Sequence, residues 1–176
     1  ERALEALAQV GGFWISDEIY EDYVWEGARH VSPVDFPAHR ERGVRLSGVS
    51  KSHHMMGWRV GWLTGPTELV TRLKPLHQHL VTAAPTFAQV AAAAGLAHHD
   101  DVVRRARRVM GRRRQLVLKR CAALDGVEVS PAQGAFYLLL EVRAHLGPDE
   151  DSLALAQRLL AEQDVVVIPG SGFGPG

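Results

Sequence analysis

The stretch that decides the fold is SGVSKSHHMMGWR, residues 47–59, which overlaps the end of a strand-like apolar run, Val44–Val49. Lys51 lies directly after that run. A single lysine after a strand usually faces solvent, but this one has Gly48 and two serines as near neighbours. A crevice at a sheet edge would partly desolvate its amine and lower the pKa. Because a neutral amine is the form that makes a Schiff base with a carbonyl, Lys51 is a candidate nucleophile.

A second polar segment, SDEIYE at residues 16–21, follows another short apolar run, Phe13–Ile15, which is typical of a buried strand. Gly11 and Gly12 end the helical pattern that precedes it. In open α/β sheets, ligands bind beyond the carboxyl ends of the strands. We therefore expect residues 16–21 and 47–59 to open onto the same edge of a parallel sheet.

Taken together, these two segments resemble the cofactor site of the class I and II aminotransferases, which are fold type I pyridoxal-phosphate (PLP) enzymes. Two later segments, Gly134–Tyr137 and Ile168–Gly174, resemble the same family in the same order. The resemblance covers essentially the whole chain, but only about the second half of a family member. It implies an α/β fold: part of an aspartate-aminotransferase-like large domain with a mixed, mostly parallel sheet, plus a small α+β C-terminal domain.

The resemblance also assigns roles to individual residues. Lys51 would carry PLP as a Schiff base and move the proton between the substrate α-carbon and the cofactor, while Asp17 would pair with the protonated pyridine nitrogen. Tyr20 would donate a hydrogen bond to the cofactor's phenolate oxygen. The planar guanidinium of Arg59 suits a phosphate dianion. Ser50 is a weaker candidate for contact with that phosphate.

The family resemblance further implies an amino acid and a 2-oxo acid as substrates, and a homodimer with active sites at its interface. Two other functions stay open: a lyase or synthase of the same fold that uses the same carbanion, and a regulatory module that binds PLP without turnover. Which amino acid is used is not readable, because the substrate-carboxylate arginine is expected beyond Gly176.

Three residues depart from the family pattern near the lysine. His53 replaces a usual aromatic residue, and His54 stands where a small residue is common. We interpret both as structural, with a role in shaping the substrate pocket as the minority interpretation. Gly48 occupies a position where some branches carry a phosphate-binding serine, so that contact is either missing or supplied elsewhere.

We divide the chain near residue 98, into the C-terminal part of a large PLP-binding domain (1–98) and an incomplete small domain (99–176). The first part ends with a predicted strand at Val60–Leu63 and helices at residues 67–73, with a kink at Pro75, and 86–98. The second starts with a long helix capped by Asp100 or Asp101. It continues with strands at residues 127–129, 135–142 and 165–168 and a helix at 152–162. Both ends look like an excerpt, so we expect the 176 residues alone to have no transaminase activity.

Composition excludes several other classes of protein. Twenty basic and twenty acidic residues give a formal net charge of zero, so no overall field favours nucleic acid. The single cysteine, Cys121, is consistent with a cytoplasmic protein. No apolar run approaches the roughly 18 residues of a membrane span, so we expect no membrane partner.

Three local patterns have simple explanations. Nine Arg and Lys residues between Arg104 and Arg120 lack interleaved aromatic residues, which indicates a solvated helix face rather than a nucleic-acid site. The glycine-rich run 170–176 fits neither the dinucleotide nor the Walker spacing, and we interpret it as a turn. The histidines form no recognisable ligand set, so we predict no metal.

Overall fold

The computed structural model describes residues 1–130 and 132–174, and the chain forms two compact units. Unit 1 comprises residues 1–111 and 133–136, and unit 2 comprises residues 112–132 and 137–176. The boundary at Gly111 falls inside one long helix, so that helix contributes to both units. The domain division proposed near residue 98 lies within unit 1 and stays a prediction.

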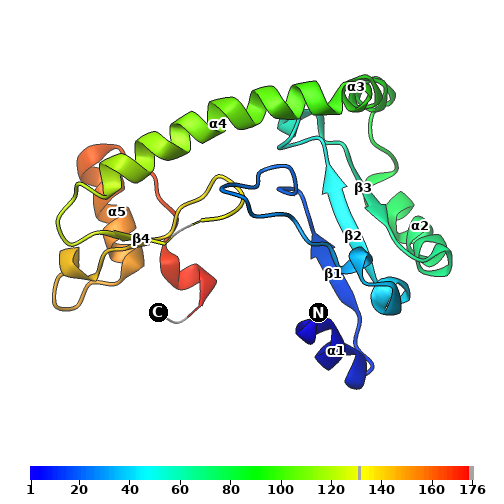
Figure 1. Cartoon of the computed structure of the whole chain (residues 1–176), viewed down its shortest axis with the longest axis horizontal. Coiled ribbons are helices and arrows are strands. Elements are labelled where there is room, and N and C mark those ends of the chain that lie inside the picture. Colours follow the sequence, from blue (N-terminus) through cyan, green and yellow to red (C-terminus); the bar gives the residue numbers. More distant parts are fainter. Residues whose placement is uncertain (131, 175–176) are drawn as a thin grey trace. The chain divides into compact units, whose positions relative to one another are not determined.

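Unit 1 is built on a three-stranded mixed sheet in the order β1-β2-β3 (Figure 1). β1 (Trp14–Asp17) runs parallel to β2 (Gly43–Gly48), and β2 pairs antiparallel with β3 (Gly61–Thr64). The predicted strands are confirmed to within one residue at each start. The register places Asp17 beside Leu46. The polar segment at residues 16–21 therefore does leave the sheet beside the end of β2, as the sequence indicated.

The first strand is less buried than its apolar sequence suggested. Trp14 is buried and its indole N–H donates to the His39 carbonyl at 2.9 Å. Phe13 and Ile15, however, are 69% and 74% exposed. β1 is an edge strand of this sheet, and alternate side chains of a strand point to opposite faces. Within the described residues, only the face that carries Trp14 is covered.

Three helices of unit 1 match or extend the predicted ones. α1 (Arg2–Gln9) and α3 (Thr86–Ala97) agree with the sequence pattern. α2 (Thr67–Val81) was predicted to stop near Leu73, but it continues through Pro75. Proline removes one backbone hydrogen bond and strains the turn before it. Helix α2 nevertheless continues to Val81, so the missing hydrogen bond at Pro75 does not end it.

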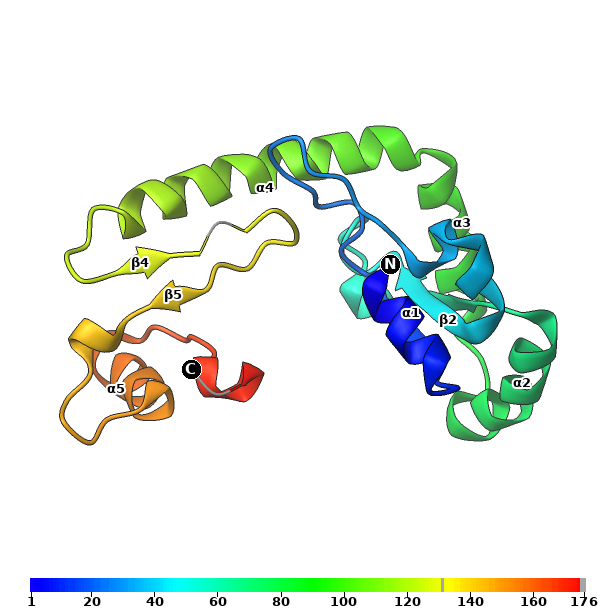
Figure 2. The ribbon, with the colours of Figure 1, turned by 60° about the horizontal axis from the view of Figure 1, so that its bottom comes forward.

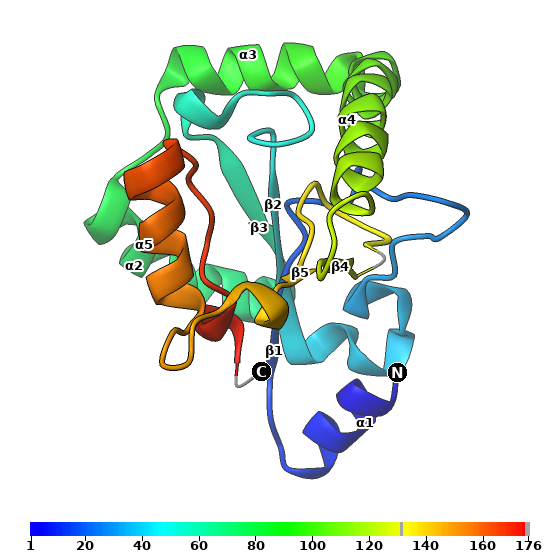
Figure 3. The same ribbon diagram turned by 90° about the vertical axis from the view of Figure 1, so that its left-hand side faces the viewer.

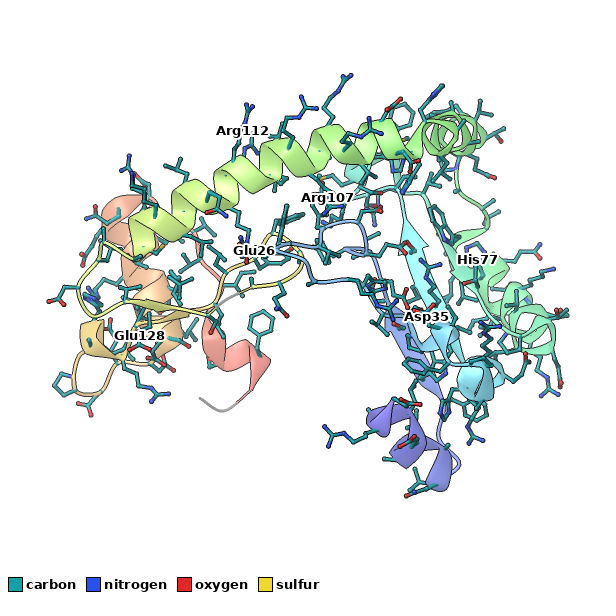
Figure 4. All side chains as sticks on the ribbon, viewed as in Figure 1. Glu26, Asp35, His77, Arg107, Arg112 and Glu128 are labelled. Carbon is teal, nitrogen blue, oxygen red and sulfur yellow. The ribbon has the colours of Figure 1, made fainter. Side chains whose placement is uncertain are left out.

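The long helix α4 (His99–Cys121) begins directly after α3, so neither Asp100 nor Asp101 caps it. Both lie inside its first turn, where carboxylates interact favourably with the helix dipole. The sequence predicts a solvated basic face on this helix, but two of its arginines bond to main-chain carbonyls instead. Arg107, which lies beside the loop that carries Glu26 (Figure 4), donates to the Val24 carbonyl at 2.7 Å. Arg114 is buried and donates to the Ala132 carbonyl.

A hydrophobic cluster in unit 1 consists of the buried residues Tyr23, Trp25 and Ala106, with Tyr20, Met110 and Phe136 packed against it. The segment 133–136 reaches this cluster by backbone pairing, since Val24 forms an isolated antiparallel bridge with Gly134. The Trp25 indole N–H also donates to the Ala135 carbonyl at 2.7 Å. These bonds bring residues 133–136 next to Tyr23, which is more than 100 residues earlier in the sequence.

Besides the end of α4, unit 2 contains a short hairpin and one further helix (Figure 2). The hairpin pairs β4 (Glu128–Val129) with β5 (Leu140–Glu141), and α5 (Ser152–Gln163) confirms the helix expected there. Arg158 of α5 donates two hydrogen bonds to the Glu150 carboxylate, both at 2.8 Å. These bonds lower the pKa of Glu150 to about 2.

Of the other two strands predicted in this region, one is much shorter than expected and one is wrong. The strand expected at residues 135–142 is reduced to β5, because residues 133–136 pair with the loop around Val24 instead and Ala135 has a positive φ of 57°. Val165–Ile168 forms no strand, and its four side chains are 41–79% exposed. An apolar run becomes a strand only when another strand satisfies its backbone groups. Residues 170–173 form the 3₁₀ turn η5, and the last two residues of the glycine-rich run lie outside the described part.

The remaining short elements are 3₁₀ turns: η1 (Pro33–Asp35), η2 (Pro37–Arg42), η3 (Met56–Trp58) and η4 (Arg143–His145). Among the described helices, none combines the length and apolar character needed to cross a bilayer.

Candidate active site

Lys51 lies in the tight turn that follows β2, and α3 lies across this turn (Figure 3). The turn is held by its own backbone: the N–H groups of His53 and Met55 donate to the Val49 carbonyl at 3.2 and 3.3 Å. Val49 is fully buried. The lysine therefore starts from a fixed backbone at the carboxyl end of a strand, as the sequence predicted.

Two aromatic rings that pack against each other lie near the lysine amine. Nζ of Lys51 is 5.8 Å from the Tyr20 ring centroid and 6.0 Å from that of Phe136. These two rings meet edge to face with centroids 5.1 Å apart. The predicted pair Lys51 and Tyr20 is thus brought together. Phe136 was part of a recognised motif but had no assigned role, and its position is set by the pairing of residues 133–136 with the Val24 loop.

Tyr23 also reaches the lysine turn, which the sequence analysis missed. Its hydroxyl donates to the main-chain carbonyl of Lys51 at 3.0 Å. The side chain is 1% exposed. Burial, together with the nearby Asp22 carboxylate, raises the pKa of the Tyr23 phenol. In the sequence, only its position three residues after Tyr20 could have pointed to this role of Tyr23.

Asp17 ends β1 with an exposed side chain. Its Oδ1 accepts a hydrogen bond from the Ile19 N–H at 3.2 Å, which orients the carboxylate at the sheet edge. Ser50 is half-buried beside Val49, whose N–H donates to the Val60 carbonyl at 3.4 Å. That bond brings the backbone next to Arg59 close to the lysine turn.

Arg59 is exposed and has left-handed backbone angles, φ 57° and ψ 47°. Its guanidinium donates to the Met56 carbonyl at 2.8 Å. A residue other than glycine in this region is strained, and such residues cluster at functional sites. Within residues 1–130 and 132–174, no hydrogen bond or ion pair joins the side chain of Asp17 or Arg59 to that of Lys51. Their common location is the sheet edge.

A polar cluster around the buried Glu18 lies beside this edge and was also missed by the sequence analysis. Glu18, next to Asp17, is 3% exposed, and its carboxylate accepts from Ser32 Oγ at 2.5 Å and from Arg45 Nε at 2.7 Å. Arg45 also bonds to Glu21, and His30 Nε2 lies 2.9 Å from Glu18 Oε2. Burial alone raises the pKa of Glu18, but hydrogen bonds from Ser32, His30, Ser16 and Arg45 outweigh burial and hold it below its ordinary value.

Ligand atoms of Glu18, Glu21 and His30 lie within 4.8 Å of one another, close enough to suggest a metal site. The guanidinium of Arg45 already donates to both carboxylates. A second cation between them would compete with that guanidinium. We therefore interpret the cluster as a structural ion pair, and the absence of a metal stays a prediction.

His53 and His54, the two departures beside the lysine, have different environments. His54 is exposed. His53 is 8% exposed; its Nδ1 lies 2.8 Å from Ser52 Oγ, and its ring stands 5.3 Å from that of His99. His99 in turn pairs with Asp22 at 3.2 Å. These contacts agree with the structural interpretation of His53.

Gly48, the third departure, has a packing reason. It lies opposite Gly61 across β2 and β3, and a Cβ on it would approach the Gly61 Cα and the Val60 carbonyl oxygen to 2.9 Å. A serine at this position would need the strands to move apart.

Only some of the predicted site residues line a common cavity. A cavity of about 420 Å³ in unit 1 is lined by Asp17 and Tyr20, together with the loop at residues 28–31 and with Gln133–Ala135. Lys51 is not among its lining residues. A larger cavity of about 880 Å³ at the start of α2 contains none of the predicted site residues.

The side chains at this edge fit PLP in their chemistry. Lys51 offers an amine for the aldehyde, and Asp17 offers an exposed carboxylate for a protonated ring nitrogen. Arg59 and Ser50 offer donors for a phosphate. The aromatic walls at Lys51 suit a planar ring.

Comparison with known proteins agrees with this chemistry. The family model described as aminotransferase class I and II matches residues 1–175. The chain is 34% identical to an arginine–pyruvate transaminase of Pseudomonas aeruginosa, over 98% of this chain and 43% of that protein. It is equally identical to an aspartate aminotransferase of Geobacillus stearothermophilus, over 97% and 45%.

Solved structures give the same result for the fold. An aromatic aminotransferase from Pyrococcus horikoshii has a TM-score of 0.89 and 31% identity, over 99% of this chain and 46% of that one. The chain thus spans less than half the length of the relatives it matches. Its mixed α/β sheet is of the aspartate-aminotransferase type. On sequence and fold alike, the chain belongs to the class I and II aminotransferase family.

Proposed function

We propose that the protein of which this chain is a part is a PLP-dependent aminotransferase that exchanges an amino group between an amino acid and a 2-oxo acid. The position of Lys51 carries the proposal: its amine lies within 6.0 Å of the Tyr20 and Phe136 rings, at the sheet edge that also presents Asp17. Membership of the family supports the reaction class.

Each residue has a distinct part in this proposal. PLP, when bound, supplies an electron sink for negative charge at the substrate α-carbon. The Lys51 amine holds the cofactor and, once released by substrate, takes and returns the α-proton. Asp17 keeps the proton on the ring nitrogen, Tyr20 donates to the ring oxygen, and Arg59 with Ser50 binds the phosphate.

The quaternary structure and compartment belong to the same proposal. A homodimer follows from the family likeness. A cytoplasmic location is supported by the single cysteine, Cys121, which is buried.

The lysine assignment has a direct test, because the chain contains three lysines: Lys51, Lys74 and Lys119. Full-length protein is mixed with PLP, reduced with borohydride and digested, and the modified peptide is identified by mass spectrometry. We expect modification at Lys51 and loss of the visible absorbance in Lys51→Ala. Lys74→Ala and Lys119→Ala, which change exposed side chains, are the matched controls and should keep both signals.

The reaction itself is tested by kinetics with a panel of amino and 2-oxo acids. Ping-pong behaviour with a required acceptor supports the aminotransferase. Release of ammonia and a 2-oxo acid without an acceptor would contradict this assignment and indicate a lyase. Attachment of PLP without any turnover would contradict it as well and indicate a regulatory module.

A further inference from the structure

Tyr23 makes an unusual connection between the aromatic core and the lysine turn. Its hydroxyl donates to the Lys51 carbonyl at 3.0 Å across 28 residues of sequence. The bond goes to the main chain of the lysine rather than to its side chain. It therefore fixes where the lysine side chain starts and leaves the amine free to react.

The tyrosine is itself tightly held. Its ring meets Phe136 edge to face at 5.6 Å and Trp25 at 6.1 Å. Its backbone N–H donates to the Tyr20 carbonyl at 2.9 Å, and its carbonyl accepts from the Ala135 N–H at 2.8 Å. Tyr23 is thus bonded through its backbone to the segments that carry Tyr20 and Phe136, the two rings near the lysine amine.

The hydrogen bonds to the Val49 carbonyl, by contrast, come from within the lysine turn. Such local bonds preserve the shape of the turn but do not fix its distance from the Tyr20 and Phe136 rings. The Tyr23 hydroxyl spans that distance. Because the phenol is buried and its pKa is raised, it stays a donor across the physiological pH range.

We propose that Tyr23 is a positioning residue, whose hydroxyl holds the Lys51 peptide so that the lysine amine stays close to the packed pair of Tyr20 and Phe136 rings. This inference rests on the proposed function of Lys51 as the PLP-binding lysine. Misplacement of a reacting group lowers rate even where binding is intact. Loss of the hydroxyl should therefore slow the reactions of the amine more than it changes substrate affinity.

The test compares Tyr23→Phe with Ala106→Gly in the full-length protein. Tyr23→Phe removes one oxygen and keeps the ring with all its packing, so the fold is retained. Ala106 is buried in the same core, and its change to glycine weakens that core without touching the Lys51 carbonyl. Thermal unfolding of both variants shows how much stability each has lost.

The main readout is the rate at which PLP attaches covalently to the apoprotein, followed by visible absorbance. We expect Tyr23→Phe to slow attachment and to lower kcat about tenfold, with KM little changed. Ala106→Gly should keep wild-type rates even if it unfolds at a lower temperature. Hydrogen exchange of the amides of residues 52–55 in the apoprotein should speed up in Tyr23→Phe and not in Ala106→Gly.

Wild-type attachment rate, kcat and exchange in Tyr23→Phe would overturn the inference. Equal losses in both variants would also overturn it, because they would reduce Tyr23 to a core residue. Failure of the proposed function has a different signature: PLP would then attach to the Lys51→Ala protein as it does to wild type.

Discussion

Arg45 Nε donates to Oε2 of Glu18 at 2.7 Å, and the side chain of Glu18 is 1% exposed. The acceptor is thus a buried carboxylate whose negative charge is stabilised by its partners and not by water. Removing one member of a buried ion pair leaves an uncompensated charge, which is far more costly than losing an exposed pair.

We therefore expect Arg45→Met to reduce the free energy of unfolding by about 3–5 kcal/mol. Arg72→Met is the control, because Arg72 pairs with Glu68 on the surface with both side chains more than three-quarters exposed. That change should cost less than about 1 kcal/mol. Urea unfolding of both variants measures the difference, and similar losses would show that Arg45 does not neutralise Glu18.

The same cluster should make stability sensitive to acid. The pKa of Glu18 is lowered in the folded protein, so its contribution is present above the ordinary value of 4.5 and is lost as the pH falls through the folded pKa. Glu18→Gln should be less stable than wild type at pH 7, and the gap should shrink below pH 4.5. A gap that does not change with pH would contradict this sign.

His53 should produce a separate loss of stability at mildly acid pH. Burial lowers the pKa of His53 and the neighbouring His99 lowers it further, as does His54, while the Gly95 carbonyl and Asp22 oppose them. The unfolded chain therefore takes up a proton first as the pH falls below 6.5, and stability declines from there through the lower folded pKa. In His53→Phe the melting temperature should fall less over this range. His77→Gln, at an exposed histidine, should behave as wild type does.

Asp17 should matter for rate rather than for folding, because its side chain is exposed at the end of β1. Asp17→Asn keeps an oxygen for the Ile19 N–H but removes the charge that would face a pyridinium. We expect kcat to fall about 10²–10³-fold, with thermal stability unchanged. Asp101→Asn, on the exposed Asp101–Arg104 pair, is the control. Turnover near the wild-type value would remove Asp17 from the site.

Arg59 should govern retention of the cofactor. Loss of charge-assisted hydrogen bonds to phosphate in Arg59→Ala should raise the Kd for PLP about ten- to hundredfold. Arg59→Lys keeps the charge without the planar fork, so its effect should be intermediate. Arg104→Ala changes an exposed arginine elsewhere and should have no effect. Dialysis followed by measurement of bound PLP distinguishes these variants.

The sequence by itself determined the family, the strand starts and the turn that carries Lys51. These depend on short-range patterns: apolar runs, glycines and polar residues at fixed spacing. For that reason β1, β2 and β3 lie within one residue of their predicted starts. Asp17 and Tyr20 follow β1, and the turn with Ser50 and Lys51 follows β2.

Only the tertiary structure decided which distant residues complete the site. Phe136 reaches Lys51 because residues 133–136 pair with the Val24 loop instead of extending the predicted strand. Glu18 became a buried ion-pair member, and Tyr23 an anchor of the lysine turn, through partners 27 and 28 residues away. Val165–Ile168 has the composition of a strand but no strand beside it. Pairing and burial depend on what the folded chain places opposite a residue, and local pattern does not contain that information.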